Sequence, residues 1–479
     1  MVFSSLTFVF LFLPITLALY FVLPVRWRNA FLLAASLLFY AWGEVNYTLV
    51  MLASIIGNYL FGCWIDDAAD PKRRRWLITL AVILNLGLLG FFKYANFVME
   101  NVDLVLAAVG LPTVDLARVH LPLGISFFTF QAMSYVIDVY RRRVAAQRRL
   151  QDLALYITLF PQLIAGPIVR YIDVARELVE RRVSGGDFAA GVRIFLVGLG
   201  KKVLIANTLA TQADQIFAIP GDQLPTSVAW IGIVFFTLQL YFDFGGYSDM
   251  AIGLGRMLGF HFLPNFNYPY ISRTLTECWQ RWHISLSTWF RDYLFKPLGG
   301  YRVSRPRAYI NLMIVFFLCG LWHGPSWNFV MFGVYQGVIL MIERVVRATH
   351  IKALRTPLGN AYFILVLLTI MVFFRTDSLA HAWAFFKAMF GFVPPNIGVY
   401  RPMAYLPPEA VIAALAGIVG SVPIIPWLSR VLSARGVERR FGLELVRQTA
   451  CFVGLATILL LSGARLAAGT HNPFIYFRF

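Results

Sequence analysis

The chain has 479 residues, of which 59% are hydrophobic and 14% are charged, and its mean hydropathy is +0.68. Soluble domains average roughly 45–50% apolar and about 25% charged residues, so this composition excludes an ordinary soluble globular protein. A net charge of +18 could indicate a nucleic-acid partner, but the basic residues gather in short loops between apolar runs. That distribution is typical of membrane proteins, so we predict one all-α polytopic membrane domain over residues 1–479 and no nucleic-acid partner.

Five apolar runs in the first 140 residues have about the length of membrane-spanning helices. Basic residues follow the first, third and fifth runs, whereas few follow the second and fourth. Because basic loops remain in the cytoplasm, the N-terminus is predicted to face outward. The first run lacks a basic n-region and a small-residue cleavage site, so we expect it to be retained. The predicted spans are 5–24, 29–42, 46–64, 76–98 and 121–139.

The next apolar run, 151–168, is broken by two prolines and a glycine, which favours a re-entrant segment over a clean span. Residues 170–186 are charged and amphipathic, as expected of a helix at the cytoplasmic interface. The run 189–209 carries two adjacent cations, Lys201 and Lys202. Two interpretations stay open for them: snorkelling from a span end, which is favoured, or contact with the phosphates of a thioester donor.

The run 226–258 carries several polar side chains in an apolar context. Carboxylates inside a membrane are costly, so they are usually paired or functional. These side chains either line a pore or substrate site, or form a polar network that ties helices together. The set comprises Gln239, Tyr241, Asp243, Tyr247, Ser248 and Asp249.

Residues 277–295 have the pattern of an interfacial amphipathic helix with aromatic anchors. Leu286 and three aromatic residues recur at helical spacing and form one stripe. His283 adjoins this stripe, and its position alone leaves a structural and a catalytic role open. The stripe consists of Trp282, Leu286, Trp289 and Tyr293.

An uncharged hairpin follows, and its turn holds one imidazole. Residues 308–322 and 327–342 carry no charge, and a Gly-Pro step breaks the helix between them. From Arg307 to His323 is 16 residues, or roughly 24 Å of helix, against a hydrocarbon core of roughly 30 Å. His323 should therefore lie recessed in the membrane, where a titratable group needs a protein-lined or aqueous cavity. We predict a functional site there; the alternative is a histidine satisfied by a neighbouring carbonyl.

Basic residues flank both ends of the hairpin, so its turn should face outward. Further spans are predicted at 359–374, 409–428 and 445–465. A buried imidazole can act as general base toward a hydroxyl group, which suits acyl transfer across the membrane. It suits a proton-coupled transporter equally well, although no inverted repeat is evident.

Motifs along nearly the whole chain resemble the membrane-bound O-acyltransferase (MBOAT) family, and within it the bacterial branch that serves alginate O-acetylation. The two histidine motifs are the most specific, and the core motifs lie within 121–345. The matching stretches are Lys93–Phe97, Leu121–Gln131, Tyr135–Arg141, Phe160–Pro167, Tyr241–Gly253, Arg281–Trp289, Arg291–Tyr293, Gly320–Gly324 and Phe474–Phe479. Five positions depart from the pattern of the branch and leave the exact acceptor open: Gly245, Cys278, Gln280, Pro325 and Gln336.

The resemblance implies a ring of tilted transmembrane helices around a central pore, with about 10–12 spans plus re-entrant and interfacial helices. It implies that His323 is the essential active-site histidine and His283 the second motif histidine. Lys201 and Lys202 are candidate contacts for donor phosphates. Candidate substrate-contacting or pore-lining residues are Gln131, Asp243, Tyr247, Ser248, Asp249 and Trp322.

The function implied by the resemblance is O-acetylation of an exported, alginate-like polysaccharide in the bacterial inner membrane. Acetyl-CoA or another acetyl thioester would be the cytoplasmic donor, and no permanently bound cofactor or metal is expected. His323 would deprotonate the acceptor, and His283 would orient it or stabilise the oxyanion. Expected partners are a periplasmic SGNH-hydrolase-like acetyltransferase, the polysaccharide export machinery and membrane lipids. The alternatives are D-alanyl transfer to teichoic acid, peptidoglycan O-acetylation, or a non-enzymatic proton-coupled transporter.

Overall fold

The computed structural model describes residues 1–114, 117–348, 356–394, 398–434, 441–469 and 471–473. Within these ranges the chain forms α-helices with short π and 3-10 turns, and no strand occurs, which confirms the all-α prediction. The last matching motif, Phe474–Phe479, lies outside the described residues.

Six helices in the described ranges are long and apolar enough to cross a bilayer, and two shorter apolar helices, Phe8–Val22 and Pro408–Gly420, accompany them. The six are α3 (Tyr47–Asp67), α4 (Pro71–Ala108), α11 (Thr226–Met257), α15 (Trp327–Ala348), α16 (Pro357–Arg375) and α20 (Phe441–Ala467). The resemblance implied about 10–12 spans. Several of the predicted apolar runs form helices that are shorter than these six.

The remaining helices do not meet these criteria of length and hydropathy, and most are shorter than the six. They are α1 (Leu13–Val22), α2 (Val25–Ala41), α5 (Ile125–Tyr140), α6 (Leu150–Thr158), α7 (Phe160–Leu163), α8 (Tyr171–Val179), α9 (Gly185–Gly200), α10 (Asn207–Phe217), α12 (Leu275–Cys278), α13 (Ile284–Phe290), α14 (Arg305–His323), α17 (Leu379–Met389), α18 (Pro408–Gly420) and α19 (Ile424–Ala434). Three π turns also occur, at η1 (Phe8–Phe12), η2 (Lys201–Ala206) and η4 (Arg291–Phe295).

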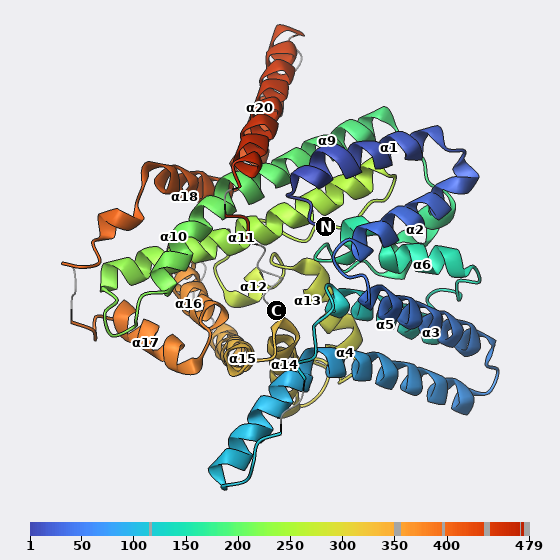
Figure 1. The fold of residues 1–479 in the computed structure, drawn as a ribbon, viewed down its shortest axis with the longest axis horizontal. Coiled ribbons are helices and arrows are strands. Elements are labelled where there is room, and N and C mark those ends of the chain that lie inside the picture. Colours follow the sequence, from blue (N-terminus) through green and yellow to red (C-terminus); the bar gives the residue numbers. More distant parts are fainter. Residues whose placement is uncertain (115–116, 349–355, 395–397, 435–440, 470, 474–479) are drawn as a thin grey trace.

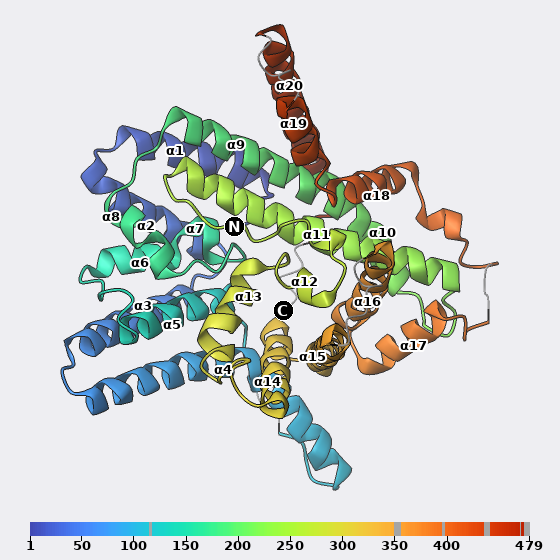
Figure 2. The ribbon, with the colours of Figure 1, turned by 180° about the vertical axis from the view of Figure 1, so that it is seen from behind.

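The helices surround a centre in which α12, α13 and the end of α14 lie (Figure 1). Along one edge α9 and α11 run side by side in both views (Figures 1 and 2). Helix α20 projects from the body, and the C-terminal end of α4 projects on the opposite side (Figure 1). The segments that carry the two histidine motifs are therefore the ones that the other helices enclose.

Two of the predicted irregularities have clear outcomes. The broken run 151–168 forms two short helices, α6 and α7, as its prolines and glycine indicated, and its side chains are buried. The prediction of one continuous span at 409–428 is wrong, because α18 ends at Gly420 and α19 begins at Ile424. Pro423 lies in that interval and lacks the amide hydrogen that a continuous helix would need.

Helices α14 and α15 pack unusually closely, and this contact positions the imidazole at the end of α14. A Cβ atom at Gly320 would overlap the carbonyl of Phe329, and one at Gly333 would overlap the carbonyl of Phe316. Only glycine lets the two backbones approach this closely, as in other tightly packed membrane helices. This close packing therefore fixes the position of the turn that follows His323 relative to α14 and α15.

Candidate active site

The predicted end of the first hairpin helix is confirmed, because α14 ends at His323. Gly324 follows in an extended conformation, and α15 begins at Trp327. The His323 side chain is 6% exposed, so it lies inside the protein. The local Gly-Pro signal thus places a titratable group at a buried helix terminus.

Aromatic rings surround His323. Its ring centroid lies 5.0 Å from Trp322, 5.2 Å from Phe332 and 5.5 Å from Phe374. Nδ1 of His323 is buried and has no hydrogen-bond partner among the described residues. A buried polar atom without a partner costs about 1–3 kcal/mol, so its presence points to function rather than to packing. The alternative of a histidine satisfied at this nitrogen by a carbonyl is not supported.

His323 lines two cavities. The first, of about 260 Å³, we call the Lys93 cavity. The second, the small pocket, has a volume of about 30 Å³ and shares His323 alone with the first cavity's lining. The Lys93 cavity is lined by Lys93, His120–Phe127, Ile164, Trp322 and His323. The small pocket is lined by Leu240, Leu275, Cys278, Trp279, Trp282, His323, Phe332, Gln336, Leu367, Ile370, Met371 and Phe374.

A larger groove adjoins the small pocket, and the two share Trp279. This groove, of about 810 Å³, also includes Cys319, one helical turn before His323. We call it the basic groove because three cations line it: Arg291, Lys296 and Arg302. The basic groove therefore connects to the small pocket through Trp279, and the small pocket connects to the Lys93 cavity through His323.

His283 does not lie within a continuous helix, so the predicted helix over 277–295 is wrong in that respect. The structure breaks it into α12, α13 and η4, and His283 adopts a left-handed conformation with φ of 43°. The predicted stripe residues lie on separate segments, and Leu286 and Trp289 are buried. The break turns His283 inward, where its side chain is 1% exposed.

Asn265 holds His283 in one orientation. The Asn265 Oδ1 atom lies 3.2 Å from His283 Nδ1 and also accepts from the backbone N–H and the hydroxyl of Ser285. An amide oxygen can only accept, so this contact is a hydrogen bond when His283 Nδ1 carries the ring proton, and Nε2 is then the unprotonated nitrogen. Nε2 is buried and has no hydrogen-bond partner among the described residues. Such a nitrogen can accept a proton or a hydrogen bond from a substrate.

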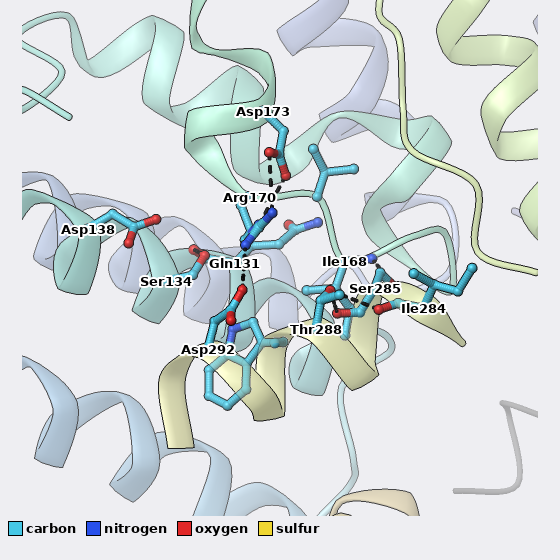
Figure 3. Close-up of polar contacts among 12 residues, drawn as sticks. Gln131, Ser134, Asp138, Ile168, Arg170, Asp173, Ile284, Ser285, Thr288 and Asp292 are labelled. Carbon is cyan, nitrogen blue, oxygen red and sulfur yellow. Dashed lines mark hydrogen bonds and ion pairs between the residues drawn. The ribbon is translucent and has the colours of Figure 1, made fainter. Parts of the chain in front are cut away.

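The network extends from Asn265 in two directions. Asn265 Nδ2 donates to Ser248 Oγ at 2.9 Å, which brings one predicted site residue into contact with the His283 support. Ser285 Oγ accepts from the backbone N–H of Ile168 at 3.0 Å (Figure 3). Asn265 carries no signal in the sequence, because it lies in a loop without any recognisable motif.

Trp322 connects the two histidines. Its ring centroid lies 5.8 Å from His283 and 5.0 Å from His323, and its Nε1 has no hydrogen-bond partner among the described residues. Trp322 also lines the Lys93 cavity. Trp322, a candidate pore-lining residue, and the two candidate catalytic histidines thus lie in one contiguous cluster.

Other predicted site residues lie in ion pairs. Lys202 contacts Asp243 at 2.6 Å, and Lys201 contacts Asp249 at 2.6 Å. Both pairs join η2 to α11. These contacts correspond to the interpretation of a polar network that ties helices together.

Two further predicted residues are buried at other positions. Tyr247 stacks on Phe3 with ring centroids 4.5 Å apart. Gln131 lies on α5, and neither polar atom of its amide has a hydrogen-bond partner among the described residues. Figure 3 shows Gln131 in the region of the Arg170 ion pairs. Neither residue lines the Lys93 cavity or the small pocket.

An ion-pair cluster anchors the segment that follows His283. Arg170 contacts Asp173 at 3.1 Å and Asp292 at 3.2 Å (Figure 3), and Asp292 also contacts Arg291 and Lys296. Partial burial acts to raise the pKa of Asp292, but hydrogen bonds from Arg291 and Lys296 outweigh it and lower that pKa to about 2. Asp292 is therefore a stable anion beside the basic groove.

Comparison with known proteins agrees with this arrangement. The profile of the membrane-bound O-acyltransferase family, MBOAT, matches residues 77–380, which contain both histidines. The chain is 40% identical to the probable alginate O-acetylase AlgI of Azotobacter vinelandii, over 100% of both chains. It is 45% identical to the protein of that name from Pseudomonas aeruginosa, over 82% of this chain and 75% of the other.

A third relative is named for a different activity. The chain is 35% identical to the peptidoglycan O-acetyltransferase of Helicobacter pylori, over 82% of this chain and 80% of the other. The family profile covers more than half of the chain, and it includes every segment that lines the Lys93 cavity and the small pocket. The chain therefore belongs to the membrane-bound O-acyltransferase family.

Proposed function

We propose that this protein transfers an acetyl group from a cytoplasmic acetyl thioester, such as acetyl-CoA, for O-acetylation of an exported polysaccharide of the alginate type. The observation that carries the proposal is the position of His323, which lines both the Lys93 cavity and the small pocket. One imidazole can therefore meet an acceptor on one side and a donor on the other. Full-length similarity to alginate O-acetylases supports the polymer.

In the proposed reaction His323 acts as general base. Its unprotonated ring nitrogen takes the proton of an acceptor hydroxyl as that oxygen attacks the thioester carbonyl carbon. The tetrahedral intermediate then collapses, the C–S bond breaks, and the imidazolium returns the proton to the departing thiolate. His283 Nε2 can accept a hydrogen bond from a second hydroxyl of a sugar acceptor, and the Trp322 indole N–H can donate one to the oxyanion.

The basic groove is the proposed donor site. Its volume of about 810 Å³ suits an extended thioester, and Arg291, Lys296 and Arg302 can contact phosphates. Lys201 and Lys202 do not line this groove, and each contacts a carboxylate of α11. Within the groove Arg291 and Lys296 also contact Asp292, so Arg302 is the preferred phosphate contact.

The small pocket favours acetyl over D-alanyl transfer. Its volume of about 30 Å³ is small, which favours a short acyl group. The described residues that line it include no carboxylate, whereas the ammonium group of a D-alanyl ester would need an anionic partner. D-alanyl transfer to teichoic acid is therefore the less favoured alternative.

The proposed topology follows from the charged loops. Helix α14 starts in the basic loop that borders the groove, and it ends at the Lys93 cavity. A cytoplasmic groove then implies that the Lys93 cavity opens outward and that the N-terminus faces the periplasm of a bacterial inner membrane. The acceptor in that cavity would be a sugar hydroxyl or a serine of a periplasmic SGNH-hydrolase-like partner.

The test uses purified protein in nanodiscs with radiolabelled acetyl-CoA and oligomannuronate as acceptor. Release of free CoA and labelling of the acceptor are expected for the wild type, and His323→Ala should lower the rate by roughly 10²–10⁴-fold. His261→Gln is the matched control, because His261 is exposed and contacts Glu177 away from both cavities. Equal turnover by wild type and His323→Ala would refute the assignment.

Separate arms distinguish the alternatives. Replacing oligomannuronate by peptidoglycan fragments tests the second polymer, and adding periplasmic extract supplies a required protein acceptor. A proton-coupled transporter predicts substrate flux into proteoliposomes with no thioester consumed. Wild-type protein that moves substrate but releases no CoA with any acceptor would exclude the transferase.

A further inference from the structure

Two consecutive side chains of α4 contact the end of α14, far away in the sequence. Tyr94 Oη donates to the backbone carbonyl of Leu321 at 2.7 Å, and the Lys93 ammonium donates to the carbonyl of Trp322. Lys93 also donates to Ser126 Oγ at 3.3 Å and is 5% exposed. The two carbonyls immediately precede His323.

The end of α14 needs such donors. The last carbonyls of a helix lack intrahelical partners, and within a continuing helix the carbonyl of Leu321 would accept from residue 325. That residue is Pro325, which has no amide hydrogen, and the extended Gly324 turns the chain away. Tyr94 and Lys93 supply the missing donors from another helix.

The lysine adds charge to this cap. A cation at a helix C-terminus is stabilised by the helix dipole, and Lys93 also lies 5.7 Å from the centre of the Trp322 ring. Its hydrogen-bond acceptors among the described residues are neutral, although burying an ammonium without a carboxylate is costly. This costly buried cation lies in the same cavity as the His323 imidazole.

We infer that Lys93 and Tyr94 are positioning residues that cap α14 and thereby fix the His323 ring between the Lys93 cavity and the small pocket. This inference rests on the proposed function for its kinetic consequence but not for its structural one. Small displacements of a general base are expensive, since a misplacement of about 1 Å can cost roughly 10²-fold in rate. Neither residue lines the basic groove, so donor binding should not depend on them.

The kinetic test compares Lys93→Met, Tyr94→Phe and Asn85→Leu in the nanodisc assay. Asn85 is the matched control, because it is a buried polar residue of α4 whose bonds go to Asn58 and Ala81 and not to α14. We expect Lys93→Met to lower kcat by roughly 10²-fold and Tyr94→Phe by roughly tenfold, each with KM for acetyl-CoA within about threefold of wild type. Asn85→Leu should lower the thermal stability and leave kcat within about threefold.

A second readout is independent of acetyl transfer. Hydrogen–deuterium exchange of the amides at 321–324 should be faster in Lys93→Met and Tyr94→Phe than in wild type, and unchanged in Asn85→Leu. Unchanged exchange, or an equal loss of kcat in Asn85→Leu, would overturn the inference. If wild type transfers no acetyl group while exchange at 321–324 responds to the two variants, the proposed function fails and the capping role stands.

Discussion

Acyl-chain selectivity gives the sharpest test of the small pocket. The perturbation is Met371→Ala, which removes a side chain that is 5% exposed and lines the pocket beside His323. With a volume of only about 30 Å³, the wild-type pocket is expected to accommodate the methyl group of an acetyl better than a longer acyl chain. An extra methylene in an apolar site discriminates by about 1–3 kcal/mol, so propionyl transfer should be roughly 10–200-fold less efficient than acetyl transfer.

The assay measures kcat/KM for acetyl-CoA, propionyl-CoA and butyryl-CoA with one acceptor. Met371→Ala should raise the propionyl-to-acetyl ratio by at least about tenfold, because the removed side chain leaves room for the longer acyl group. Met389→Ala is the control, since Met389 is equally buried on α17 and lines neither cavity. Wild-type protein that used butyryl-CoA as well as acetyl-CoA, or the same ratio in both variants, would refute the assignment of the pocket.

Three further predictions concern the framework of the site. Asn265→Ala leaves three donors without their acceptor, so it should lower the unfolding free energy by about 3 kcal/mol or more. Asn265→Asp keeps the oxygen that holds His283 and should lower it less; thermal unfolding in detergent compares the two variants. Gly333→Ala should lower the unfolding free energy by more than about 1 kcal/mol, because the added Cβ overpacks α14 against α15. Gly57→Ala is the control, since a Cβ there meets open space, and equal melting temperatures of the two variants would contradict the prediction. Because the pKa of Asp292 is lowered to about 2, its ionised carboxylate stabilises the folded protein fully above about pH 4, and this contribution is lost as the pH falls through about 2. Asp292→Asn should therefore melt below wild type at pH 7, and the difference should shrink steadily toward pH 2.

Local signals in the sequence predicted the local features of the site. The Gly-Pro step after His323 predicted the end of α14, since proline disfavours helix at the residue before it. Prolines and a glycine likewise predicted the break in 151–168. The spacing of aromatic residues was misleading around His283, because residues 279–283 form turns that end in the left-handed His283 and so interrupt the helix that the spacing implied.

Contacts between distant segments could not be predicted in the same way. Asn265 carries no sequence signal, because its importance comes from three donors that tertiary folding brings to one oxygen. The Lys93 motif was recognised, but its contact with α14 joins residues more than two hundred positions apart. Ion pairing of Lys201 and Lys202 with α11 likewise depends on how η2 packs against that helix.

The sequence of cavities has a consequence for the cell that is unrelated to catalysis. On the proposed topology, the small pocket lies between the basic groove and the Lys93 cavity, with Trp279 shared at one junction and His323 at the other. Where cavities from opposite faces come this close, the transmembrane voltage would fall across the side chains between them. The bulky rings at these two junctions would then also restrict ion leakage where the acyl group crosses.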